Sequence, residues 1–178
     1  FILNQLNEGS DHVVKRVNNI QIPEGSSWLT LEYCGNDLEH PLVKSLLKYN
    51  ATSCLEMCRA VAKGLAYLHS NNIVHRDLKG NNIFSSSNLE APFVNTKVGD
   101  LGGAIKLTDD RKHYHELNGE TFKGDDKDGR GSLRNRSPET HKAVSSIEKN
   151  GENHKLFEPD QPSADMWALG CVLLESYT

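Results

Sequence analysis

The sequence has few cysteines, no long apolar run and no excess of positive charge, and each shortage excludes a class of protein. The four cysteines in 178 residues follow no zinc-binding spacing and are too few for a disulfide scaffold, so reduced thiols are expected. The longest apolar stretch, residues 166–174, is too short to cross a bilayer. Because the net charge is −4, we expect neither nucleic acid nor a membrane as a partner.

What remains is the composition of a soluble, folded domain, with 37% hydrophobic and 25% charged residues. Alternating and β-rich patterns predict strands over residues 13–20 and 28–34, and a short hairpin that pairs 83–84 with 96–98. Helical spacing of apolar residues from Leu55 predicts a long amphipathic helix that ends near Ser70. A terminal helix is expected from residues 162–165, with Ser163 as its N-cap.

The most informative stretch is His-Arg-Asp-Leu-Lys-Gly-Asn-Asn at residues 75–82, followed downstream by Asp100 in Val-Gly-Asp-Leu-Gly. Phosphoryl transfer requires mainly positioning and charge neutralisation from a protein. A carboxylate such as Asp77 can orient a substrate hydroxyl and accept its proton, while Lys79 can stabilise the transferring phosphoryl group. The oxygens of Asn82 and Asp100 suit magnesium bound to nucleotide phosphates.

The order and spacing of these residues resemble the catalytic and metal-binding loops of eukaryotic protein kinases. Three further motifs follow the family's order: residues 31–38 resemble the hinge, 131–139 the end of the activation segment, and 165–170 the start of the central helix of the C-lobe. The sequence His-Arg-Asp-Leu-Lys is similar to that of serine/threonine kinases.

The resemblance implies an α+β, two-lobed kinase fold that is truncated at both ends. Residues 1–33 are expected to be the C-terminal part of the N-lobe, and residues 34–178 the hinge and a mainly helical, partial C-lobe. The family's Gly-rich loop, its strand lysine and its helix glutamate do not occur in this sequence. We therefore expect the 178-residue piece alone to lack measurable kinase activity. Because ATP and reduced thiols are found in the cytosol and the nucleus, we expect the whole protein to be cytosolic or nuclear.

ATP and Mg²⁺ are the implied cofactors, and a protein substrate is the implied partner. Asp77, Lys79 and Asn82 are the implied catalytic residues, while Asn82 and Asp100 are the implied metal ligands. The remaining implied nucleotide contacts are Leu31 as the gatekeeper, the backbones of Glu32 and Cys34 at the adenine edge, Asp37 at the ribose, and Phe84 under the adenine ring.

Supporting residues are implied as well. Asp165 is expected to bond the backbone of the catalytic loop, Ser132 to bond the catalytic Asp and Lys, and His75 to pack in the core and order the loop. One hypothesis concerns Arg76, which in many kinases binds an activating phosphate: a carboxylate of the acidic run 125–128 takes the place of that phosphate. The alternatives are that this run is a solvated loop, and that Thr121 is a conventional phosphosite.

Two functional classes stay open from the sequence. The first is an active serine/threonine kinase, and the second is a pseudokinase that acts as a binding or scaffold module. The presence of Asp77, Lys79, Asn82 and Asp100 favours the enzyme. A third class, a small-molecule phosphotransferase of kinase-like fold, is disfavoured by Ser-Pro-Glu at residues 137–139, which resembles a motif of protein-substrate binding.

Overall fold

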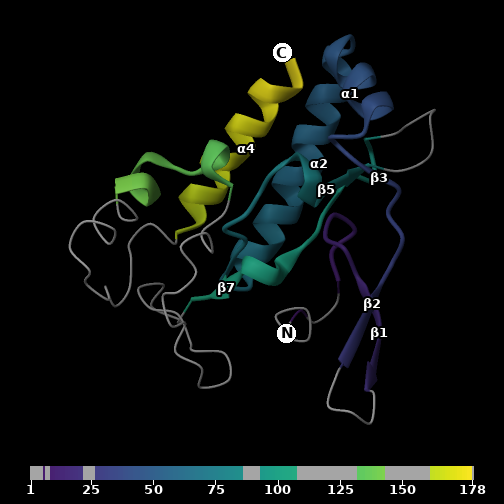
Figure 1. Cartoon of the computed structure of the whole chain (residues 1–178), viewed down its shortest axis with the longest axis vertical. Coiled ribbons are helices and arrows are strands. Elements are labelled where there is room, and N and C mark those ends of the chain that lie inside the picture. The colour runs from purple at the N-terminus through teal and green to yellow at the C-terminus, as the bar shows by residue number, and fades with distance from the viewer. Residues whose placement is uncertain are drawn as a thin grey trace.

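A computed structural model describes residue 6 and the ranges 9–21, 27–85, 93–107, 132–142 and 161–177. Three helices lie side by side, and a strand hairpin extends away from them (Figure 1). Helix α2 (Ala51–Ser70) runs through the middle of the helical part and contacts both α1 (Pro41–Lys48) and α4 (Pro162–Tyr177). Within the described ranges, no helix has the length and apolar character needed to span a membrane.

The extended hairpin consists of β1 (Arg16–Gln21) and β2 (Ser27–Leu31), which pair antiparallel. Both predicted strands are therefore present, but the second ends at Leu31, so residues 32–34 do not belong to it. Gly35, with a φ of 93°, follows this non-strand segment in a backbone conformation that favours glycine. The chain thus leaves the hairpin through an irregular linker, residues 32–35, which leads into the helical part.

The helices begin where local capping chemistry favours it. Pro41 opens α1 (Pro41–Lys48), a helix that the sequence reading missed. The side chain of Asn50 accepts a hydrogen bond from the backbone N–H of Ser53 at 3.1 Å and caps α2 (Ala51–Ser70). The expected long helix is confirmed, and it starts four residues earlier than Leu55.

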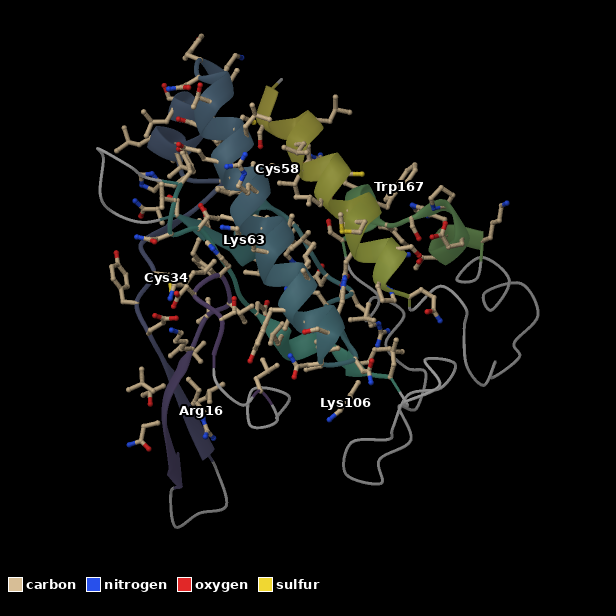
Figure 2. All side chains as sticks on the ribbon, turned by 180° about the vertical axis from the view of Figure 1, so that it is seen from behind. Arg16, Cys34, Cys58, Lys63, Lys106 and Trp167 are labelled. Atoms are coloured by element: carbon tan, nitrogen blue, oxygen red, sulfur yellow. The ribbon has the colours of Figure 1, made fainter. Side chains whose placement is uncertain are left out.

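The expected N-cap of the terminal helix was wrong. Helix α4 (Pro162–Tyr177) already includes Pro162, which places Ser163 inside its first turn. Proline is well tolerated there because the first backbone N–H groups of a helix have no partner within it. On the far side of this helix, Trp167 is 49% exposed and lies away from α2 (Figure 2).

The core forms around the inward face of α2. Met57, Val61, Leu65 and Leu68 of this helix are completely buried. Cys54 is also buried, and Cys58 packs against the core. Apolar residues from α1, α4, the short strands and the turn 93–95 complete the same cluster, among them Leu47, Leu169, Ile73, Ile83, Phe93 and Val98.

Short strands place two loops next to each other. In one sheet, β5 (Ile83–Ser85) lies between β3 (Asn36–Asp37) and β6 (Lys97–Val98). In another, β4 (Ile73–Val74) pairs antiparallel with β7 (Ile105–Lys106). The pairing of β5 with β6 confirms the predicted short hairpin. The loop 75–82 joins β4 to β5, and the loop 99–104 joins β6 to β7. Because β4 pairs with β7 and β5 pairs with β6, these two loops lie side by side.

Candidate active site

The backbone of the loop 75–82 is fixed by a carboxylate from another helix. Asp165, on α4 and only 1% exposed, accepts hydrogen bonds from the backbone N–H groups of His75 and Arg76, both at 2.9 Å. It also lies 2.8 Å from Nε2 of His69 on α2. Arg76 has a φ of 70°, a conformation that non-glycine residues rarely adopt without support. The predicted bond between Asp165 and the loop is confirmed.

His75 joins the two neighbouring loops. Its ring is completely buried, and Nε2 lies 2.9 Å from the carbonyl oxygen of Gly99 while Nδ1 lies 3.3 Å from the backbone N–H of Asp77. A carbonyl can only accept and an N–H can only donate, so this arrangement requires the neutral ring with its proton on Nε2. The expectation that His75 packs in the core and orders the loop is confirmed.

The Asp77 carboxylate is the centre of the site. Its Oδ2 accepts hydrogen bonds from Lys79 Nζ at 2.7 Å and from Asn82 Nδ2 at 3.3 Å, and its Oδ1 accepts one from the backbone N–H of Ser132 at 2.8 Å. The amide of Asn82 also donates to the carbonyl of Asp77 at 2.8 Å. Ser132 makes this contact with Asp77 through its backbone N–H. The three implied catalytic residues are thus brought together around one partly exposed carboxylate.

Asp100 follows on the adjacent loop. It has a φ of 56°, its side chain accepts a hydrogen bond from the Gly102 N–H at 3.3 Å, and it is exposed. The backbone N–H of Gly99 donates to the carbonyl of Asn82 at 2.9 Å, which places the two implied metal ligands on directly bonded segments.

The donor set fits magnesium. Because the nitrogen of the Asn82 amide is turned toward Asp77, its oxygen is the atom that remains for a cation. Magnesium binds few protein oxygens and takes its other ligands from water and phosphate. Among the residues that the structure describes, no cluster of three or more His, Cys, Asp or Glu side chains could hold a metal ion by itself.

The implied nucleotide residues lie along the linker and the strand pair beside it. Leu31 ends β2 and is 43% exposed, and Asp37 in β3 is paired with Phe84 in β5. Cys34 lies at the junction between the hairpin and the part of the molecule that contains α2 (Figure 2). Its thiol lies 3.6 Å from the carbonyl oxygen of Glu32. Burial raises the pKa of this thiol, and the carboxylate of Glu32 raises it further.

Gly99 allows this wall of the site to pack closely. A Cβ atom on Gly99 would come within 2.8 Å of both the Phe84 ring and a methyl group of Val14. Any larger residue must therefore displace Phe84, the side chain implied to lie under the adenine ring, or Val14. The position directly before Asp100 consequently requires glycine for a steric reason.

An ion pair that sequence reasoning missed lies behind the linker. Lys97 Nζ is 2.7 Å and 2.8 Å from the two carboxylate oxygens of Glu32, and Glu32 Oε1 also accepts the backbone N–H of Lys15 at 2.7 Å. The sequence drew attention only to the backbone of Glu32. The one available signal was a lysine three positions before Asp100, whose partner lies 65 residues away along the chain.

A cavity of about 460 Å³ reaches the loop of Asp77 at Gly80. Gly80 from that loop lines it, as does Arg134, which follows shortly after Ser132. Charged side chains of both signs from α1 and α4 complete the lining, including Lys44, Lys48 and Glu175.

The Ser137 hydroxyl lies 2.9 Å from the Thr140 hydroxyl at the start of the following helical turn.

Several expected features lie outside the described residues. These are Thr121 and the acidic run 125–128, so the hypothesis about Arg76 and an acidic partner stays a prediction. The division into lobes at residues 33 and 34 also stays a prediction.

Comparison with known proteins accounts for this geometry. The chain matches the protein kinase domain family over residues 1–178. It belongs to the protein kinase family. The chain also resembles a chain in a crystal structure of the yeast RNA Pol II CTD kinase CTDK-1 complex, with a TM-score of 0.67 over 98% of this chain and 47% of the other. At 22% identity this likeness shows the fold, and it confirms the expected partial kinase domain.

Curated relatives are serine/threonine kinases by name. An Arabidopsis thaliana protein named serine/threonine-protein kinase 1 is 39% identical over 101 residues, which are 54% of this chain and 11% of the relative. A mouse protein named inactive serine/threonine-protein kinase PLK5 is 28% identical over 146 residues, which are 82% of this chain and 19% of the relative. The chain thus spans less than a fifth of the length of either relative.

Proposed function

We propose that this chain is part of a protein serine/threonine kinase that transfers the γ-phosphate of ATP to a Ser or Thr hydroxyl of a protein substrate. The observation that carries the proposal is the Asp77 carboxylate, held by Lys79, Asn82 and Ser132 directly beside the loop of Asp100. Such a cluster provides a positioned base, a cation and metal ligands, which are the parts that phosphoryl transfer requires.

In this mechanism Asp77 acts on the substrate hydroxyl. Its carboxylate orients the hydroxyl and accepts its proton, and the bonds from Ser132 and Asn82 keep it in place. Lys79 is 2.7 Å from the same carboxylate, so its ammonium group stands where the transferring phosphoryl group meets the hydroxyl. Asn82 and Asp100 would hold magnesium, which when bound neutralises charge on the nucleotide phosphates.

The linker supplies the adenine end of the proposed nucleotide site. The carbonyl of Glu32 and the backbone of Cys34 would bond the adenine edge, with Leu31 as gatekeeper and Phe84 under the ring. Because the Cys34 thiol already lies 3.6 Å from the Glu32 carbonyl, adenine would replace a weak sulfur contact with a stronger N–H donor. Asp37 would bind the ribose, because it lies just after the linker.

The substrate protein would lie along the other side of Asp77. Ser132, whose N–H binds Asp77, leads directly to Arg134 at the edge of the cavity of about 460 Å³. Gly80, three residues after Asp77, lines the same cavity. A peptide that presents its hydroxyl to Asp77 would therefore place neighbouring side chains in this cavity. We propose the cytosol or nucleus as the location, where ATP and reduced thiols are found.

A pseudokinase is the second candidate, because one relative at 28% identity over 82% of this chain is named as an inactive kinase. Against it, all four residues that the chemistry requires in this part of the domain are present: Lys79 and Asn82 bond the Asp77 carboxylate, and Asp100 follows on the adjacent loop. A pseudokinase would bind partners or nucleotide without transfer.

The test is phosphate transfer from ATP by the full-length protein to peptides that carry a single Ser, Thr or Tyr. We expect magnesium-dependent labelling of the Ser and Thr peptides, and an Asp100→Asn variant that loses it. As a matched control, Asp11→Asn removes an exposed carboxylate that pairs with Lys15, and it should transfer phosphate like the wild type. Nucleotide binding without transfer to any peptide would instead establish the pseudokinase.

A further inference from the structure

The proposed nucleotide site has two ends on different segments. The adenine end is the linker 32–35, and the phosphate end is formed by Asn82 and Asp100. A ligand that binds both ends at once gains affinity only if their separation already matches its length. Something must therefore fix the distance between the linker and the loop of Asp100.

The ion pair between Glu32 and Lys97 connects these two ends. Glu32 is the first residue of the linker, and Lys97 lies in β6, three residues before Asp100. Both carboxylate oxygens of Glu32 lie within 2.8 Å of Lys97 Nζ, and the side chains are only 27% and 15% exposed. Such a two-oxygen, charge-assisted contact restricts distance and orientation more than a single bond does.

Two hydrogen bonds between Lys15 and Glu32 hold the start of the linker as well. The N–H of Glu32 donates to the carbonyl of Lys15 at 3.0 Å, and the N–H of Lys15 donates to Glu32 Oε1 at 2.7 Å. The chain just before Lys15 is bound to β6 as well, since the N–H of Val14 donates to the carbonyl of Val98 at 2.8 Å. The Glu32 carboxylate thus joins three segments that are distant in sequence, and one of them continues directly to Asp100.

We propose that the Glu32–Lys97 pair is a positioning strut that fixes the adenine end of the nucleotide site relative to its phosphate end. The proposal rests on the proposed function, because it assigns the nucleotide to these two ends. It predicts a particular pattern of affinities. Loss of the strut weakens a ligand that spans both ends, such as ADP with magnesium, and leaves adenosine, which needs one end, nearly unaffected.

The test measures dissociation constants of adenosine and of ADP with Mg²⁺ by calorimetry on the full-length protein. For Lys97→Met we expect about a tenfold weaker affinity for ADP with Mg²⁺, the size typical of losing a partly buried, charge-assisted contact, and less than about a twofold change for adenosine. Lys97→Arg keeps the charge and the two-oxygen contact, so its affinities should stay within about twofold of the wild type.

Two further variants separate the strut from general damage. Glu32→Gln keeps an oxygen for the Lys15 N–H but removes the charge, and combining it with Lys97→Met should add little to either single change. Asp11→Asn removes an ion pair of 3.0 Å between exposed side chains next to the same segment, and should change neither constant. Thermal unfolding of each variant verifies that it is folded.

The outcomes are distinguishable. Equal weakening of adenosine and ADP would overturn the strut, because the pair would then only shape the adenine end. Unchanged or tighter binding of ADP by Lys97→Met would overturn it too. A wild-type protein that binds no nucleotide would overturn the proposed function and the strut together, whereas nucleotide binding that is equal in all variants would overturn the strut alone.

Discussion

The loop that carries Asp77 and the linker 32–35 would hold opposite ends of one nucleotide, and the structure fixes them in different ways. The backbone of the loop is held by two buried side chains, that of Asp165 on α4 and that of its own His75, which are 1% and 0% exposed. The linker is less buried, with Tyr33 86% exposed and its other residues half-buried, and the Glu32–Lys97 pair joins it to the strand before Asp100. The buried contacts that fix the geometry of the loop therefore also stabilise the fold. The contacts that fix the geometry of the linker can change without a large loss of stability.

This comparison predicts that substitutions of the buried residues that hold the loop reduce stability and activity together. Substitutions at the linker should instead change the affinity for nucleotide. The largest effect is expected for Asp165→Ala, which leaves the buried N–H of His75 and the partly buried N–H of Arg76 without their acceptor. Removing one partner from a buried charged network typically costs about 3–5 kcal/mol. We expect a loss of this size in urea unfolding of the full-length protein. A loss below about 1 kcal/mol would contradict the role given to Asp165.

A second prediction concerns the wall between the two ends. Gly99→Val should destabilise the protein by about 1–3 kcal/mol, because its side chain would collide with Phe84 and Val14. Gly170→Ala is the matched control: nothing lies within 4 Å of a Cβ there, and alanine in the middle of α4 should stabilise by about 0.5–1 kcal/mol. Thermal or urea unfolding of both variants measures the difference. Equal effects would show that Phe84 adapts freely.

The N-cap of α2 lies far from both ends and provides a smaller, local effect. Asn50→Ala removes the acceptor of the Ser53 N–H, which should cost about 1 kcal/mol in unfolding free energy. Asn50→Ser keeps a capping oxygen and should stay close to the wild type. Neither change should alter nucleotide affinity. An altered affinity would mean that α2 transmits strain to the site, contrary to the comparison.

The smallest effect is expected at Cys34. Since burial and Glu32 raise the pKa of its thiol, the reactive thiolate is scarce at neutral pH and alkylation should be slow. Its alkylation rate, followed by mass spectrometry of the peptide that contains it, should continue to rise above about pH 9, where a free thiol levels off. Cys34→Ser identifies the peptide. A rate that levels off near neutral pH would show a thiolate stabilised by its surroundings.

The sequence predicted the loop better than the linker, and the reason is local spacing. Asp77, Lys79 and Asn82 lie within six residues, so their proximity is a property of the short segment itself. The pairing of Glu32 with Lys97 spans 65 residues and exists only because β6 returns beside the linker. No local pattern contains that information.

Two misassigned helix features have similar physical causes. Helix α1 has eight residues, and its Leu42 is 64% exposed, so only tertiary packing of Val43 and Leu47 distinguishes it from a turn. At α4 two start signals stood next to each other, and proline at the first position prevailed over serine as a cap. By contrast, the apolar residues of α2 keep helical spacing over many residues, which was sufficient to predict that helix.

The central claim is that Asp77 is the base of a working phosphotransferase site. The most direct measurement is the transfer rate of the full-length protein beside its Asp77→Asn variant, at saturating ATP and magnesium and with matched thermal unfolding. The account predicts a rate lower by about a hundredfold to ten-thousandfold in the variant, with nucleotide affinity nearly unchanged. Equal rates in the two proteins, or no transfer by either, would contradict it.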